Sequence, residues 1–73
     1  MIIFVRLLNE STVVYRPVDA RRISEKIFEI IDHAQEQDET WEFGHRDRVY
    51  CIEHAFQDGS KGLIATSRAE SAA

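Results

Sequence analysis

A single cysteine in a chain of 73 residues limits what this sequence can fold into. The chain cannot form an internal disulfide, so its stability has to come from one small hydrophobic core. A chain of this length buries only about 60% of the surface that its unfolded form exposes, which also favours self-association. We therefore expect one globular domain over residues 1–66 and a flexible, polar C-terminal tail over residues 67–73.

The balance of charge argues against a general nucleic-acid-binding protein. The formal net charge is −4, whereas phosphate backbones are bound by basic surfaces. The first residues, Met1–Arg6, are apolar but lack the basic start of a signal peptide, and no apolar run approaches the ~20 residues that cross a bilayer. With a free cysteine, which suits a reducing compartment, the sequence predicts a cytoplasmic protein that does not enter a membrane.

The N-terminal part predicts a β-hairpin. Ile2–Leu8 is rich in β-branched and aromatic residues, and it is apolar on both faces apart from one arginine. Asn9–Thr12 has turn chemistry, and Val13–Arg16 is typical of a second strand. Pro17 has no N–H to donate, so we expect it to end regular pairing or to lie at a sheet edge.

Residues 20–35 allow two interpretations. Apolar residues recur at the spacing of an amphipathic helix, at Ile23, Ile27, Ile30, Ile31 and Ala34. The alternative is a turn near Ser24 followed by a strand over Lys26–Ile31, which the β-forming Ile-Phe-Glu-Ile-Ile run supports.

The centre of the chain combines an acidic segment with the residues best suited to a core. Residues 32–40 are polar and predict either the fraying end of a helix or a solvated acidic loop. In an extended chain Trp41 and Phe43 share one face. Gly44–Asp47 predicts a turn, and Arg48–Phe56 predicts the longest strand.

The C-terminal part predicts a second hairpin. A bulge near Glu53 and His54 would return Phe56 to the apolar side of the long strand. The dipeptide Asp58–Gly59 is a strong hairpin signal, because glycine adopts positive φ without steric cost. Gly62–Thr66 would form the last strand.

Three pieces of the sequence together resemble a group of small, uncharacterised bacterial proteins. The pieces are Val14–Ala20, Asp38–Phe43 with Asp47–Cys51, and Phe56–Gly59 with Gly62–Ala65. They are similar to the Arg-Pro-Val, Trp-Glu-Phe and Asp-Gly segments of that group, across residues 3 to 66. The chain departs from the group where His45 and Arg46 stand in place of Pro-Gly before Asp47. The resemblance implies a mostly β, SH3-like barrel and a strand at Lys26–Ile31, but no activity and no functional residues.

These patterns lead to a prediction of an all-β domain. We expect about five antiparallel strands in a small, partly open SH3-like barrel; the alternative is an α+β fold with one helix at about 20–35. The expected core consists of Ile3, Val5, Leu7, Val14, Ile27, Ile30, Trp41, Phe43, Val49, Cys51, Phe56, Leu63 and Ala65.

No residue pattern predicts catalysis, a metal or a cofactor. Cys51 and His54 are three residues apart, so on a regular strand they point to opposite faces and cannot chelate together. A nucleophilic Cys51 would need a nearby histidine or cation, whereas a cysteine between apolar neighbours is typical of a core.

The leading functional hypothesis is therefore a non-enzymatic protein- or peptide-interaction module. Exposed aromatic and basic residues would form its surface, namely Tyr15, Arg16, His45, Arg46, Arg48 and Tyr50. The alternative is a small barrel that binds nucleic acid through Arg16, Arg21, Arg22 and Lys26.

Overall fold

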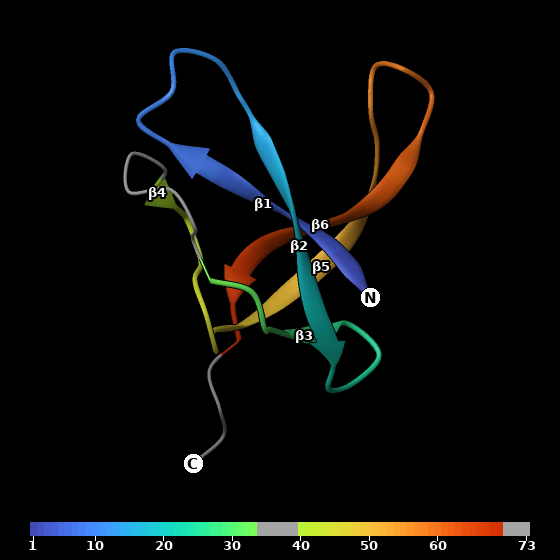
Figure 1. The fold of residues 1–73 in the computed structure, drawn as a ribbon. Helices are drawn as coiled ribbons and strands as arrows, with labels where there is room; N and C mark the ends of the chain where they lie inside the picture. Colours follow the sequence, from blue (N-terminus) through green and yellow to red (C-terminus); the bar gives the residue numbers. More distant parts are fainter. Residues whose placement is uncertain (34–39, 70–73) are drawn as a thin grey trace.

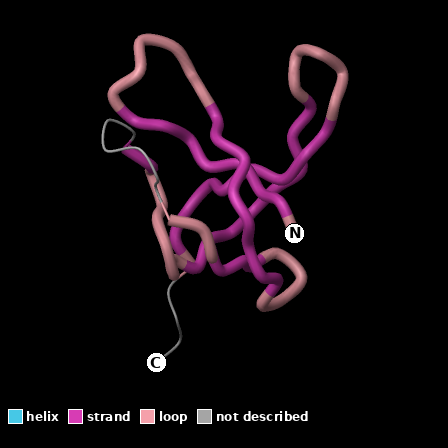
Figure 2. Tube along the Cα trace, in the orientation of Figure 1, coloured by secondary structure: helices cyan, strands magenta, loops and turns pink. Residues whose placement is uncertain are grey.

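The computed structural model describes residues 1–33 and 40–69, and all of its regular structure is β-strand (Figures 1 and 2). The strands are β1 (Ile2–Leu8), β2 (Tyr15–Arg22), β3 (Ile27–Ile30), β4 (Thr40–Trp41), β5 (Arg48–Ala55) and β6 (Lys61–Arg68). The all-β prediction is confirmed. The helical interpretation is wrong over residues 20–33. This part of the chain contains the end of β2 and the strand β3 instead of a helix. Nowhere in the described part of the chain is there a helix that could cross a membrane.

The strands bond to one another in a ring. β1 pairs with β2, β2 with β3, β3 with β5, β5 with β6, and β6 returns to β1. The β6–β1 contact, between Phe4 and Ile64, is parallel, and the other strand pairs are antiparallel. The short β4 adds to β1 at Leu7 and Leu8. The result is a small barrel-like sheet, with six strands instead of about five and one parallel pairing that the sequence did not indicate.

The first hairpin forms as predicted, but Pro17 does not end it. Pro17 lies within β2 and stands opposite Phe4 of β1. β3 pairs with β2 only from Ala20 onward, so the missing N–H of Pro17 lies on an unpaired stretch of edge. The second part of the expectation, an edge position, is therefore confirmed.

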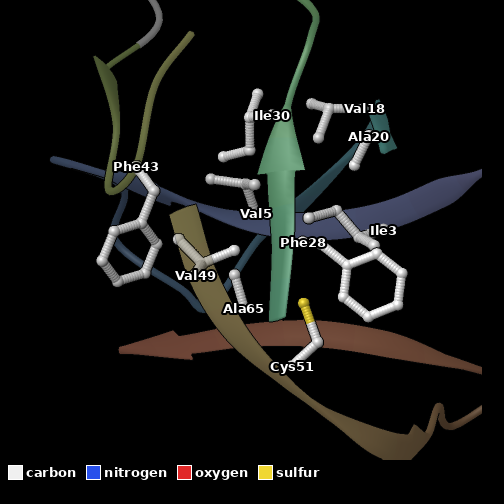
Figure 3. Packing of buried hydrophobic residues seen from close by; sticks show 10 residues of the cluster. All are labelled: Ile3, Val5, Val18, Ala20, Phe28, Ile30, Phe43, Val49, Cys51 and Ala65. Atoms are coloured by element: carbon white, nitrogen blue, oxygen red, sulfur yellow. The ribbon is translucent and has the colours of Figure 1, made fainter. Parts of the chain in front are cut away.

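The core fills the interior of the ring (Figure 3). Eight of the expected core residues are buried: Ile3, Val5, Leu7, Ile30, Phe43, Val49, Cys51 and Ala65. Five others are only half-buried: Val14, Ile27, Trp41, Phe56 and Leu63. Five buried residues were not predicted: Val18, Ala20, Phe28, Ile64 and Ala69.

The errors in the predicted core follow from strand geometry. Side chains on a strand alternate between its two faces, so Ile27 and Ile30 cannot both point inward. Phe28 and Ile30 take the inner face of β3, and Ile27 is left on the outer face. Val18 and Ala20 alternate inward in the same way, on the part of β2 that follows Pro17.

The bulge lies elsewhere than predicted. Tyr50 pairs with Ser67 and Cys51 pairs with Ala65, so the extra residue is Thr66 of β6 and not Glu53 or His54. Because β5 stays regular up to Ala55, nothing turns the side chain of Phe56 into the core.

The C-terminal strand is longer than expected. β6 continues through Ser67 and Arg68 instead of ending at Thr66, and Ala69 is buried. Residues 70–73, and residues 34–39 of the predicted acidic loop, lie outside the described part of the chain.

Candidate functional site

Two hairpin loops extend from the same end of the sheet, one between β1 and β2 and one between β5 and β6 (Figure 1). An open cleft of about 680 Å³ lies between them. Its lining comes from β1, from both loops and from the start of β2: Phe4, Val13, Val14, Tyr15, Phe56, Gln57, Asp58 and Ser60. A volume of this size is typical of protein binding sites for small ligands or single side chains.

Aromatic rings form one wall of this cleft. The ring centroids of Phe4 and Phe56 lie 4.9 Å apart, and the Phe56 ring meets His54 edge-on at 4.9 Å. Tyr15 lies 6.0 Å from the rings of both His54 and Phe56. These separations are those of favourable aromatic pairs. Four rings from four segments therefore support one another on the outside of the sheet.

Gly62 makes room for this cluster. A Cβ at position 62 would lie 2.6 Å from Cε2 of Phe4 and 3.2 Å from Cε2 of Phe56. Real Cβ atoms do not approach other atoms as closely as the first of these distances, so a larger residue would move the Phe4 ring. The glycine lets the aromatic wall lie directly on β6.

The rim of the cleft carries a stable negative charge. The Ser60 hydroxyl and the Ser60 backbone N–H both donate to Oδ1 of Asp58, at 2.6 and 2.9 Å. These hydrogen bonds hold the pKa of the Asp58 carboxyl below its ordinary value. The carboxylate therefore stays ionised beside an apolar wall.

The predicted interaction residues do not form one surface. Tyr15 lies in the cleft and Arg16 follows it on β2. His45 and Arg46 line a separate polar cavity beside Arg21, six positions farther along β2, or about 20 Å on an extended strand. Arg48 and Tyr50 lie on the exposed face of β5. Only Tyr15 lines the aromatic cleft.

The basic residues of the nucleic-acid alternative are largely engaged within the protein. Arg21 forms a 2.6 Å ion pair with Glu29. Arg22 donates to the backbone carbonyl oxygens of Ser24 and Glu25. Lys26 is exposed at the end of the same turn. At least two of these four basic side chains, Arg21 and Arg22, are therefore engaged by other groups of the protein.

Phe4, His54 and Val13 were not predicted as site residues, and Phe56 was assigned to the core. A signal for Phe4 was present, because β1 is apolar on both faces and only one face can enter the barrel. Phe56 was expected in the core because a bulge was predicted near Glu53 and His54, and β5 has no bulge there. No local pattern indicated that the two loops would line the same cleft.

Cys51 is a core residue. Its side chain is 4% exposed, and burial raises the pKa of its thiol from the ordinary 9.0 to about 11. The thiol is therefore protonated at neutral pH, which is the opposite of an activated nucleophile. Among residues 1–33 and 40–69, no three side chains of ligand type gather in a way that could hold a metal ion.

Searches among protein-family models, curated proteins and solved structures gave no match to this chain. A functional interpretation therefore has to come from the chemistry of its surface.

Proposed function

We propose that this chain is a non-enzymatic interaction module of the cytoplasm, an SH3-like barrel that binds an extended apolar peptide segment of a protein partner. The observation that supports this proposal is the aromatic cleft between the two hairpin loops. An extended segment exposes alternate side chains, and aromatic rings are the surfaces on which such side chains pack when proline-rich or apolar peptides are recognised.

The negative charge beside the cleft limits which peptide segments of a partner can bind. Asp58 places an ionised carboxylate at the rim, and the whole chain carries a formal charge of −4. A lysine or arginine next to the apolar residues of the partner would pair with this carboxylate. We therefore expect the bound segment to combine one or two apolar or proline residues with a basic residue.

Selection from a random peptide library followed by NMR titration tests the proposal. Selected peptides should share an apolar and basic pattern, and their binding should shift the signals of Tyr15, Phe56 and Asp58. Tyr15→Ala should abolish binding, and Asp58→Asn, which keeps an acceptor for Ser60, should weaken it about threefold or more. Failure to select any peptide above background would contradict the proposal.

Tyr50→Ala is the matched control. Tyr50 is a tyrosine of the same barrel, 43% exposed on β5 and outside the cleft lining. It should leave peptide binding unchanged. If Tyr50→Ala abolishes binding and Tyr15→Ala does not, the interaction belongs to the outer face of β5. A titration with single-stranded RNA at low salt tests the alternative that uses Arg16, Arg21, Arg22 and Lys26.

A further inference from the structure

A polar cavity at the C-terminal end of β2 differs in chemistry from the aromatic cleft. It measures about 460 Å³ and is lined by Arg21, Glu29, Ile30, Ile31, His45 and Arg46. These residues come from β2, from β3 and its end, and from the turn between β4 and β5. The cavity is therefore assembled by the fold and not by one loop.

The turn that carries Arg46 is firmly held. The Arg46 N–H donates to the Ile30 carbonyl oxygen at 2.7 Å, and the Ile30 N–H donates to the Asp47 carbonyl oxygen at 3.0 Å. Within the turn, the Gly44 N–H donates to the Asp47 carboxylate at 2.8 Å. The position of Arg46 relative to β3 is thus set by backbone hydrogen bonds on both sides.

His45 forms a second attachment of the same turn. Its Nδ1 lies 2.7 Å from the Ile31 carbonyl oxygen, and because a carbonyl only accepts, Nδ1 carries a proton. The His33 ring stacks on it at 3.7 Å between centroids. The imidazole therefore forms a fixed wall of the cavity.

Arg46 occupies a backbone conformation that arginine does not favour. Its φ is 70°, in the left-handed region where a glycine would be free of strain. Within residues 1–33 and 40–69, its guanidinium makes no hydrogen bond or ion pair. An arginine in a strained conformation lines this cavity, and its charge has no partner among the described residues, which points to a role for that charge in binding.

Two arginines and one glutamate line the cavity, so the formal charge of its lining is positive. Glu29 accepts from Arg21 at 2.6 Å and lies 3.9 Å from Nε of Arg48. One carboxylate is thus shared by two guanidinium groups, and Arg46 adds a third. The surroundings of Glu29 can therefore accommodate a further anion.

We propose that this cavity binds a phosphate group, held between Arg46 and Arg21. Guanidinium groups donate parallel pairs of hydrogen bonds to phosphate oxygens, and donors from separate segments can reach different oxygens of a tetrahedral anion. A planar carboxylate offers only two oxygens. Arg21 already donates to a carboxylate, that of Glu29. The site is independent of the aromatic cleft, at the opposite end of β2.

Titration with inorganic phosphate at constant ionic strength, followed by 1H–15N NMR, tests the proposal. We expect saturable shifts at Arg21, at residues 29–31 and at residues 44–46. Sulfate, of the same shape, should bind at the same residues, and acetate should bind at least about tenfold more weakly. Non-saturable shifts, shifts mapping to other residues, or acetate affinity equal to that of phosphate would overturn it.

The Arg46→Gly variant distinguishes a loss of phosphate binding from a loss of stability. Glycine adopts the left-handed φ without strain, so this variant should be at least as stable as the parent and yet bind phosphate at least about tenfold more weakly. Arg6→Gln removes one positive charge from an exposed position on β1, outside the cavity, and should change the affinity less than about twofold. Equal losses in both variants, or no loss in Arg46→Gly, would refute the assignment.

Discussion

Replacing Phe28 with alanine should remove a large part of the stability of this domain. Phe28 is 2% exposed and heads the fully buried side chains by volume. Its ring belongs to the core cluster, beside Ile3 and Cys51 in Figure 3. Truncating a buried phenylalanine costs about 3–5 kcal/mol. At about 0.05–0.15 kcal/mol per residue, a domain of this length has about 4–11 kcal/mol in total.

Urea denaturation followed by the fluorescence of Trp41 and by circular dichroism measures this loss. With a slope of about 1 kcal/mol per molar urea, the midpoint should fall by about 3 M or more. If Phe28→Ala does not fold, Phe28→Leu, which keeps most of the apolar volume, should fold with a loss of about 1–1.5 kcal/mol.

The adjacent residue is the matched control. Ile27 lies on the outer face of β3 and is only half-buried, so Ile27→Ala should cost about 1 kcal/mol. The ratio of the two losses tests which face of β3 enters the barrel. If Ile27→Ala cost as much as Phe28→Ala, or more, the register of β3 and the argument from side-chain alternation would be refuted.

Three further predictions concern single residues. Gly59 has a φ of 90°, so Gly59→Ala should cost about 1–2 kcal/mol by urea denaturation, whereas Gly44→Ala, with open space around it, should cost much less. The Cys51 thiol should react with a disulfide reagent only on unfolding. The pKa of this thiol is about 11 in the folded state and 9.0 ordinarily, so the unfolded state loses the proton first. The free energy of unfolding should therefore fall between about pH 9 and 11. Asp47→Ala removes the acceptor of both the Gly44 N–H and the Arg68 guanidinium and should lower stability by about 1 kcal/mol; an unchanged urea midpoint would show that the turn does not depend on these bonds.

The aromatic cleft shows why the candidate site was harder to predict than the fold. Tyr15 was recognised as an exposed aromatic residue, but Phe56, whose ring lies near it, follows it by about forty residues of sequence. His45 and Arg46 were recognised from the unusual turn. Their cavity depends on Ile30 and Ile31, to which the turn is hydrogen-bonded, and no local pattern predicts such a contact between distant segments.

The sequence by itself indicated the β-strands at both ends of the chain and the turns between them. The β-branched strands, the Asp58–Gly59 hairpin and the Gly44–Asp47 turn are local features, because they depend on side-chain branching and on the φ that each residue tolerates. The lone cysteine between apolar residues likewise indicated its own burial, which the structure confirms.

Tertiary structure decided the rest. Whether residues 27–30 form helix or strand depended on β2 and β5, which supply hydrogen-bonding partners on both sides of β3. The bulge at Thr66 and the closure of β6 onto β1 depended on how strands far apart in sequence align. These are pairings between distant segments, and their energy comes from burying one face of each strand. The periodicity of a single segment does not reveal which strands it will pair with.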